Sequence, residues 1–205
     1  MKVKICGITS VESAIDSVEA GADALGFMFA KSKRKISPDD AREIIDHLPN
    51  DVDRVGVFVN EPPEMVKHIA DYCRLTAIQL HGEESVEDYL SLQLNLIKSV
   101  KVTIDGPDSL CNAKAAHSIL LDTAGGKYRG GNGRPFDWNL VKDIGRTWPN
   151  IILAGGLDKD NVQKAIKVVK PYMVDVSSGV EINGKKSKLL IKEFIEKVKG
   201  VEFHD

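Results

Sequence analysis

The chain has 205 residues, a formal net charge of −2 and 42% hydrophobic residues. This length and apolar content suffice for one sizeable core, and the near-neutral charge argues against a broad surface for nucleic acid or membrane. The sequence has no apolar run near the roughly 20 residues that cross a bilayer and no signal-peptide pattern at its start.

Strand and helix patterns alternate along the whole chain. Apolar, β-branched runs predict eight strands, at residues 3–6, 24–29, 54–59, 77–80, 96–100, 118–121, 151–154 and 173–176. Amphipathic spacing predicts a helix after each strand, at residues 11–20, 38–48, 61–70, 84–92, 103–116, 137–144, 158–169 and 186–198. The segment 103–116 has the weakest periodicity. Thr9 or Ser10, Ser37 and Asp158 are the expected helix caps.

The alternation predicts an α/β fold. Eight strand–helix pairs with short connections imply a parallel sheet, and eight units also permit closure into a barrel, which removes exposed sheet edges. An open doubly wound sheet is the alternative. It is disfavoured because the first strand lacks the GxGxxG loop of a dinucleotide fold. The sequence therefore predicts a single (β/α)₈ TIM barrel domain over residues 1–205.

The three cysteines, Cys6, Cys73 and Cys111, have no CxxC or paired spacing. No two cysteine or histidine residues have the spacing of a zinc site. The pattern predicts reduced thiols in a cytoplasmic protein, and no metal site.

Two residues at strand ends are candidates for catalysis. Cys6 ends the first strand, where it could be a nucleophile, a base or a buried packing residue, and packing is the better interpretation for Cys6 alone. Asp122 follows an apolar strand, where a carboxylate is costly unless it is used or hydrogen-bonded. A cap for the following loop is an equally good interpretation of Asp122.

Two loops after the last two strands are candidates for phosphate binding. Gly155 and Gly156 follow the seventh strand, and Ser177, Ser178 and Gly179 follow the eighth. Glycines let backbone N–H groups approach an anion, and these two loops often hold a phosphate in (β/α)₈ enzymes. Ordinary helix-start turns are the alternative, but the presence of both loops favours phosphate binding.

Other polar residues lie in or after different strands. Arg34 belongs to a basic cluster at residues 31–35 and could pair with a ligand carboxylate, although composition alone favours a solvated cluster. His81 could hydrogen-bond a ligand or be structural. Asp175 could hold substrate hydroxyls or cap a neighbouring loop. The glycine-rich segment 125–133 could fold over a ligand or be an ordinary mobile loop.

Three motifs occur in a highly specific order: KICGIT at residues 4–9, QLHG at 79–82 and DVSSGVE at 175–181. With them, nearly the whole chain resembles the phosphoribosylanthranilate isomerase family. Members of that family fold as a (β/α)₈ barrel, use no cofactor and act in tryptophan biosynthesis. It converts N-(5-phosphoribosyl)anthranilate to 1-(2-carboxyphenylamino)-1-deoxyribulose 5-phosphate by an Amadori rearrangement.

The resemblance implies a role for each candidate residue. Cys6 would be the general base, Asp122 the general acid, and Arg34 would hold the anthranilate carboxylate. His81 and Asp175 would contact the substrate. The phosphate would be held by Gly155, Gly156, Ser177, Ser178 and Gly179. The expected partner is a small phosphosugar, bound by a cytoplasmic monomer or homodimer that uses no cofactor and contacts neither nucleic acid nor membrane.

Two other functions remain as alternatives. The histidine-pathway sugar-phosphate isomerase performs the same rearrangement on a similar barrel, but it is expected to carry an aspartate where this chain has Cys6, and to have two similar halves. A non-catalytic ligand-binding barrel would be expected to lose the acid–base pair, and here both Cys6 and Asp122 are present.

Overall fold

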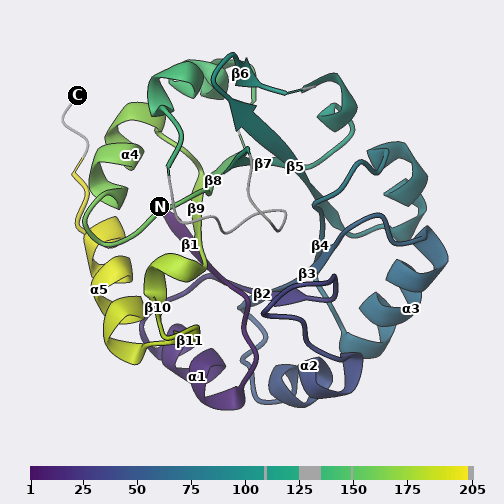
Figure 1. Ribbon diagram of the computed structural model, residues 1–205. Coiled ribbons are helices and arrows are strands. Elements are labelled where there is room, and N and C mark those ends of the chain that lie inside the picture. Colours follow the sequence, from purple (N-terminus) through teal and green to yellow (C-terminus); the bar gives the residue numbers. More distant parts are fainter. Residues whose placement is uncertain (109, 125–134, 149, 203–205) are drawn as a thin grey trace.

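The computed structural model describes residues 1–108, 110–124, 135–148 and 150–202. Its main feature is a closed barrel of parallel strands (Figure 1). The barrel strands are β1 (Lys2–Cys6), β2 (Ala24–Met28), β3 (Asp53–Phe58), β4 (Ala77–Leu80), β5 (Asn95–Thr103), β7 (Ser118–Thr123), β8 (Ile151–Leu153) and β9 (Met173–Val176). Pairing of β1 with β9 and of β4 with β5 closes the ring. The predicted (β/α)₈ barrel is therefore confirmed.

Helices surround the barrel as an outer ring (Figure 1). The α-helices of the described residues are α1 (Val11–Glu19), α2 (Pro38–Ile45), α3 (Pro63–Cys73), α4 (Val162–Val169) and α5 (Lys188–Lys199). The side chains of Ser10 and Ser37 accept hydrogen bonds from the backbone N–H groups of Ser13 and Asp40. Both predicted caps are thus confirmed, and each satisfies one of the orphan donors of a helix start.

Two predicted helices are 3₁₀ segments instead. Residues 84–92 form η1 (Val86–Leu92), and residues 137–144 form η3 (Trp138–Val141) followed by η4 (Ile144–Arg146). The buried residues of η1 are Val86 and Tyr89, and those of η3 are Trp138 and Val141, three residues apart in each case. Side chains at i and i+3 eclipse on a 3₁₀-helix, so this spacing buries both. The weakly periodic segment 103–116 begins with Thr103, the last residue of β5, and its other described residues contain only β6 (Gly106–Pro107) and η2 (Leu110–Ala113).

Two further helix starts lie later in the chain than predicted. Asp158 does not cap α4; its carboxylate accepts from the N–H groups of Asp160 and Asn161 in the preceding turn. Lys186 lies in a small hairpin of β10 (Glu181–Ile182) and β11 (Lys185–Lys186), and α5 begins after its cap Ser187. Both helices start late for the same reason. A polar turn precedes each of them, and such a turn does not change the apolar periodicity from which the helix was predicted.

The core has two layers. One lies between the strands and the helices, and the other lies inside the barrel. The inner layer consists of Ala24, Val55, Ala77, Ile97, Leu120, Ile152, Ala154 and Met173. Toward the carboxyl ends the inward positions become polar, and these residues are also buried. Since buried polar groups need partners, this polar half of the interior determines the site.

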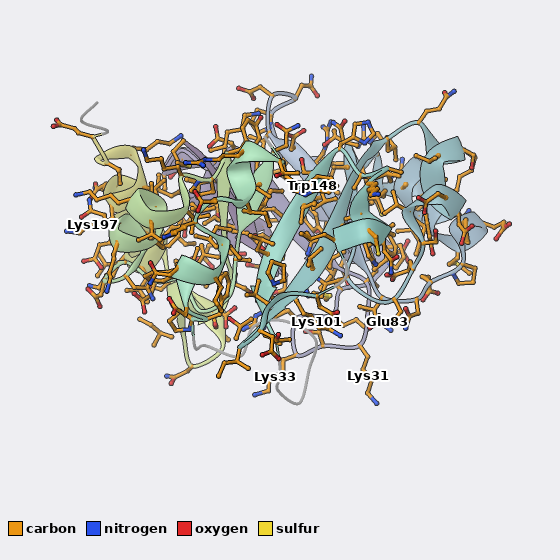
Figure 2. The ribbon with its side chains drawn as sticks, turned by 90° about the horizontal axis from the view of Figure 1, so that it is seen from above. Lys31, Lys33, Glu83, Lys101, Trp148 and Lys197 are labelled. Atoms are coloured by element: carbon orange, nitrogen blue, oxygen red, sulfur yellow. The ribbon has the colours of Figure 1, made fainter. Side chains whose placement is uncertain are left out.

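The two ends of the barrel differ in their side chains. Figure 2 views the barrel from the side: Lys31, Lys33, Glu83 and Lys101 lie along one edge, and Trp148 lies nearer the opposite one. The first edge carries the loops that follow the strands, where (β/α)₈ enzymes place their active sites. The described part of the chain contains no helix that is long and apolar enough to span a bilayer.

A buried ion pair holds the carboxyl ends of β3, β4 and β5 together. Lys98 Nζ lies 3.2 Å from Glu84 Oε2 and donates to the carbonyl of Gly82 at 2.9 Å. Glu84 also accepts from the N–H groups of Asn60 and Gly82. Glu84 is therefore a buried residue that links the segments after β3 and β4 to β5, and it is not the first residue of the helix predicted at 84–92.

We expect Lys98→Met to lower the free energy of unfolding by about 3 kcal/mol, because it leaves the Glu84 carboxylate buried without its cation. Urea denaturation measures the loss. Lys101→Met is the matched control on the same strand; its partner Glu83 is exposed, so a change below about 1 kcal/mol is expected. Equal effects of the two variants would contradict this linking role.

Candidate active site

Cys6 ends β1 at the barrel mouth, and the backbone around it makes room for the thiol. Cys6 pairs with Gly26 of β2, and a Cβ at Gly26 would lie 2.7 Å from Cys6 Sγ. Gly7, with φ +80°, then turns the chain, and its N–H donates to the Gly26 carbonyl. Cys6 is 6% exposed. The thiol thus lies buried close against the backbone of β2.

Four charged side chains lie close enough to the Cys6 thiol to interact with it electrostatically. Burial raises its pKa above the ordinary value, Lys4 and Lys186 lower it, and Asp175 raises it again. Arg34 is also close enough for its own pKa to respond to Cys6. The net pKa is raised, so the resting group is a thiol, and thiolate formation requires further positive charge.

We expect Gly26→Ala to displace the thiol and to lower kcat about tenfold or more, because misplacing a reacting group by about 1 Å is costly. Steady-state kinetics on the substrate proposed below measures this effect. Gly145→Ala is the control, since a Cβ there meets nothing within 4 Å. Unchanged kcat in Gly26→Ala would show that the position of the thiol does not matter.

Asp122 lies in β7 and is buried, with 5% of its surface exposed. Its Oδ1 accepts a hydrogen bond from the Thr123 N–H at 2.7 Å. This oxygen therefore caps the following loop, as one of the two interpretations predicts. Its Oδ2 faces His81 Nε2 at 3.5 Å. Gly155 is required beside it, because a Cβ there would lie 3.0 Å from Asp122 Oδ1 and the residue has φ +81°. Asp122 thus lies between Gly155 and His81, and it lines the cavity described below.

The two predicted phosphate loops lie against each other. Gly155 and Gly156 both have positive φ, and a Cβ at Gly179 would come within 2.0 Å of the Leu157 carbonyl. Only glycine permits such a close approach. The loops line one small cavity of about 40 Å³, together with residues of β7 and β9. Its predicted site residues are Asp122, Gly155, Gly156, Asp175, Ser177 and Ser178.

The hydroxyl of Ser177 is already engaged within the protein. It donates to the Cys6 carbonyl at 3.0 Å and lies 3.3 Å from Lys186 Nζ, which donates to it. This arrangement ties the loop after β9 to the end of β1. An anion in the cavity would therefore meet backbone N–H groups of these loops rather than the Ser177 hydroxyl.

Arg34 reaches the mouth, but one edge of its guanidinium is occupied. Its Nε and Nη2 donate to the two carboxylate oxygens of Glu181 at 2.6 and 2.8 Å. Lys186 Nζ donates to the same carboxylate at 2.7 Å. Burial raises the pKa of Glu181, but Arg34 and Lys186 outweigh burial and hold it below the ordinary value. The solvated-cluster interpretation is wrong for Arg34, because Glu181 holds its guanidinium; among the described residues, no hydrogen bond to its Nη1 is seen.

His81 and Asp175 join a buried network that sequence reasoning missed. Lys4 Nζ donates to Asp175 Oδ1 at 2.9 Å and to Gln79 Oε1 at 3.0 Å, and Gln79 Nε2 lies 2.9 Å from His81 Nδ1. The loop-cap alternative for Asp175 is thus replaced by an ion pair. The missed signal was strand alternation: Lys4 precedes Cys6 by two residues, and Gln79 precedes His81 by two, so each pair shares a face.

Lys4 is fully buried, and its charge is maintained by its neighbours. Burial lowers its pKa, but Asp175 and Cys6 raise it, and the net pKa lies above the ordinary value. Cys6 and Cys73 are buried free thiols. The glycine-rich segment predicted as a loop at 125–133 lies outside the described residues.

Comparison with known proteins gives a consistent result. The family model described as N-(5'-phosphoribosyl)anthranilate (PRA) isomerase matches residues 3–197. The N-(5'-phosphoribosyl)anthranilate isomerase of Bacillus cereus is 50% identical over 198 residues, covering 96% of this chain and 98% of the relative.

Solved structures agree in fold. A phosphoribosyl anthranilate isomerase in complex with reduced 1-(o-carboxyphenylamino)-1-deoxyribulose 5-phosphate superposes with a TM-score of 0.86 at 46% identity, covering 98% of this chain and 99% of that one. Monomers generated from the dimeric enzyme of Thermotoga maritima give a TM-score of 0.85 at 46% identity and the same coverage. This chain therefore belongs to the N-(5'-phosphoribosyl)anthranilate isomerase family.

Proposed function

We propose that this chain isomerises N-(5'-phosphoribosyl)anthranilate to 1-(2-carboxyphenylamino)-1-deoxyribulose 5-phosphate, a step of tryptophan biosynthesis. The observation that carries the proposal is one mouth that holds a buried thiol, a buried carboxyl group, and two glycine-containing loops in contact with each other. Family membership supports the same reaction. An Amadori rearrangement requires an acid and a base but no external electron acceptor. The carboxyl group and the thiol can supply the acid and the base.

The first step is ring opening, with Asp122 as the acid. Its carboxyl group gives a proton to the furanose ring oxygen, and the bond between that oxygen and C1 breaks. The anilinic nitrogen supplies its electron pair to C1, which forms a protonated imine. The carboxylate that remains keeps its hydrogen bond from the Thr123 N–H, and its other oxygen lies 3.5 Å from His81 Nε2.

The second step is proton removal from C2, with Cys6 as the base. The positive charge of the imine acidifies the C2–H bond. The same charge favours the thiolate form of Cys6, and so opposes the raised pKa that Cys6 has without substrate. Lys4 and Lys186 favour the thiolate as well. Removal of the C2 proton returns the electron pair to nitrogen and leaves an enolamine, which tautomerises to the ketone.

Two anion-binding regions would hold the substrate between acid and base. We assign the phosphate to the loops at Gly155–Gly156 and 177–179, and the anthranilate carboxylate to the Nη1 side of Arg34. Glu181 fixes the guanidinium plane from its other edge. Anchoring both ends orients the reacting atoms, which is a large part of enzymatic rate enhancement.

The activity is tested by incubating the purified chain with phosphoribosylanthranilate and separating the products by chromatography. We expect the ketose isomer to appear, and no ketose above the non-enzymatic rate would contradict the proposal. The assay with the histidine-pathway substrate distinguishes the alternative isomerase. Size-exclusion chromatography tests the proposed assembly as a monomer or homodimer, and the free thiols of Cys6 and Cys73 fit the proposed cytoplasmic location.

We expect Arg34→Ala to lower kcat/KM about 10- to 100-fold, the range for a lost hydrogen bond to a charged group. The inhibition constant of inorganic phosphate should change much less, because the phosphate loops lie elsewhere. Arg146→Ala is the control, since Arg146 is exposed and pairs only with Asp143 among the described residues. Unchanged kcat and KM in Arg34→Ala would remove Arg34 from the site.

A further inference from the structure

A continuous chain of buried polar contacts crosses the barrel interior beneath the mouth. It runs from Asp175 through Lys4 to Gln79, then to His81 and finally to Asp122. The distances are 2.9, 3.0, 2.9 and 3.5 Å in that order. Every member is at most 9% exposed. The proposed function uses Asp122, but it leaves Lys4 and Gln79 without a role in the hydrogen bonding of the acid.

The donors and acceptors of this chain allow one arrangement. A lysine ammonium has only donors, so the Gln79 atom that faces Lys4 must be the oxygen. The Gln79 amide nitrogen then faces His81 Nδ1, and because an amide nitrogen only donates, Nδ1 must be the acceptor. Neutral His81 therefore carries its proton on Nε2, and this nitrogen lies 3.5 Å from Asp122 Oδ2.

We propose that Lys4 and Gln79 are positioning residues that fix the tautomer of His81, so that His81 donates to Asp122 and never accepts its proton. The inference rests on the proposed function, in which Asp122 gives a proton to the furanose oxygen. In the opposite tautomer, Nε2 would be an acceptor aimed at the acid. The Asp122 proton would then be held by His81 instead of being delivered to the substrate.

The fixed tautomer also serves the step after proton transfer. The new carboxylate would meet two donors, the Thr123 N–H at Oδ1 and the His81 Nε2–H at Oδ2. Hydrogen bonds to an ionised carboxylate are stronger than those to the neutral acid. His81 would therefore stabilise the product of ring opening more than the resting acid, which is the differential binding that accelerates a step.

Nitrogen-15 NMR of the imidazole ring tests the tautomer without any turnover. We expect His81 in the unmodified protein to have an unprotonated Nδ1 and a protonated Nε2 at neutral pH, with the signals assigned by their loss in His81→Gln. In Gln79→Glu, an isosteric change, the carboxylate can only accept, so Nδ1 should become protonated. A protonated Nδ1 in the unmodified protein would overturn the proposal, whether or not any variant folds.

Kinetics tests the consequence. Gln79→Glu should lower kcat about 10- to 100-fold, as expected for an outer partner of a functional histidine, with little change in KM. The loss should largely disappear in the Asp122→Asn background, because Gln79 acts through Asp122. Gln163→Glu on α4 is the matched control. Full kcat in Gln79→Glu would overturn the role, whereas absence of turnover in the unmodified chain would refute the proposed function and leave the NMR result to decide the tautomer.

Discussion

Replacing Cys6 by serine is expected to lower kcat for phosphoribosylanthranilate by about 10²–10⁴-fold, the range for loss of a general base. A serine hydroxyl is a far weaker acid than a thiol, so the imine and the two lysines would not generate an alkoxide. The free energy of unfolding should change by less than about 2 kcal/mol, since the volumes are similar and Lys4 can donate to the hydroxyl. Steady-state kinetics and urea denaturation of the same preparation separate the two effects.

Cys73→Ser is the matched control for the thiol. Cys73 is also buried, and its Sγ donates to the Pro38 carbonyl at 3.4 Å, far from the mouth on α3. Its variant should retain kcat even if it loses some stability. Near-normal kcat in Cys6→Ser would refute the assignment of Cys6 as the base and would return it to the packing interpretation.

Replacing Asp122 by asparagine is expected to lower kcat by a similar factor, about 10²–10⁴-fold. The amide keeps the size of the carboxyl group and can still accept from the Thr123 N–H, but it has no acidic proton for the furanose oxygen. Substrate binding should change much less than kcat, because the phosphate loops and Arg34 are untouched. Pre-steady-state measurements would show substrate bound with its ring closed.

The control for Asp122 is a carboxylate at the other end of the barrel. Asp53 begins β3 and lines a separate cavity at the amino ends of the strands. Asp53→Asn should leave kcat within about twofold, since charge there is far from the reacting atoms. If Asp122→Asn retained normal kcat, or if both variants lost activity equally, Asp122 could not be the specific acid.

Local patterns suffice to predict the strands and two of the helix caps. Each barrel strand lies near its predicted position because a short apolar run bounded by glycine or polar residues is a local feature. The caps Ser10 and Ser37 follow the same logic. The 3₁₀ segments resemble ordinary helices in sequence because their few buried residues also fit a helical spacing. Their tighter winding depends on what they pack against.

By itself, the sequence determined the barrel, the strand ends and the two residues expected to act there, Cys6 and Asp122. Only the tertiary structure decided which buried polar side chains meet. Lys4 and Asp175 are 171 residues apart, and Arg34 and Glu181 are 147 apart. Strand alternation places a side chain inside the barrel, but barrel closure and stagger decide which partner faces it. Those long-range contacts define the charge around Cys6 and the hydrogen-bond direction at His81.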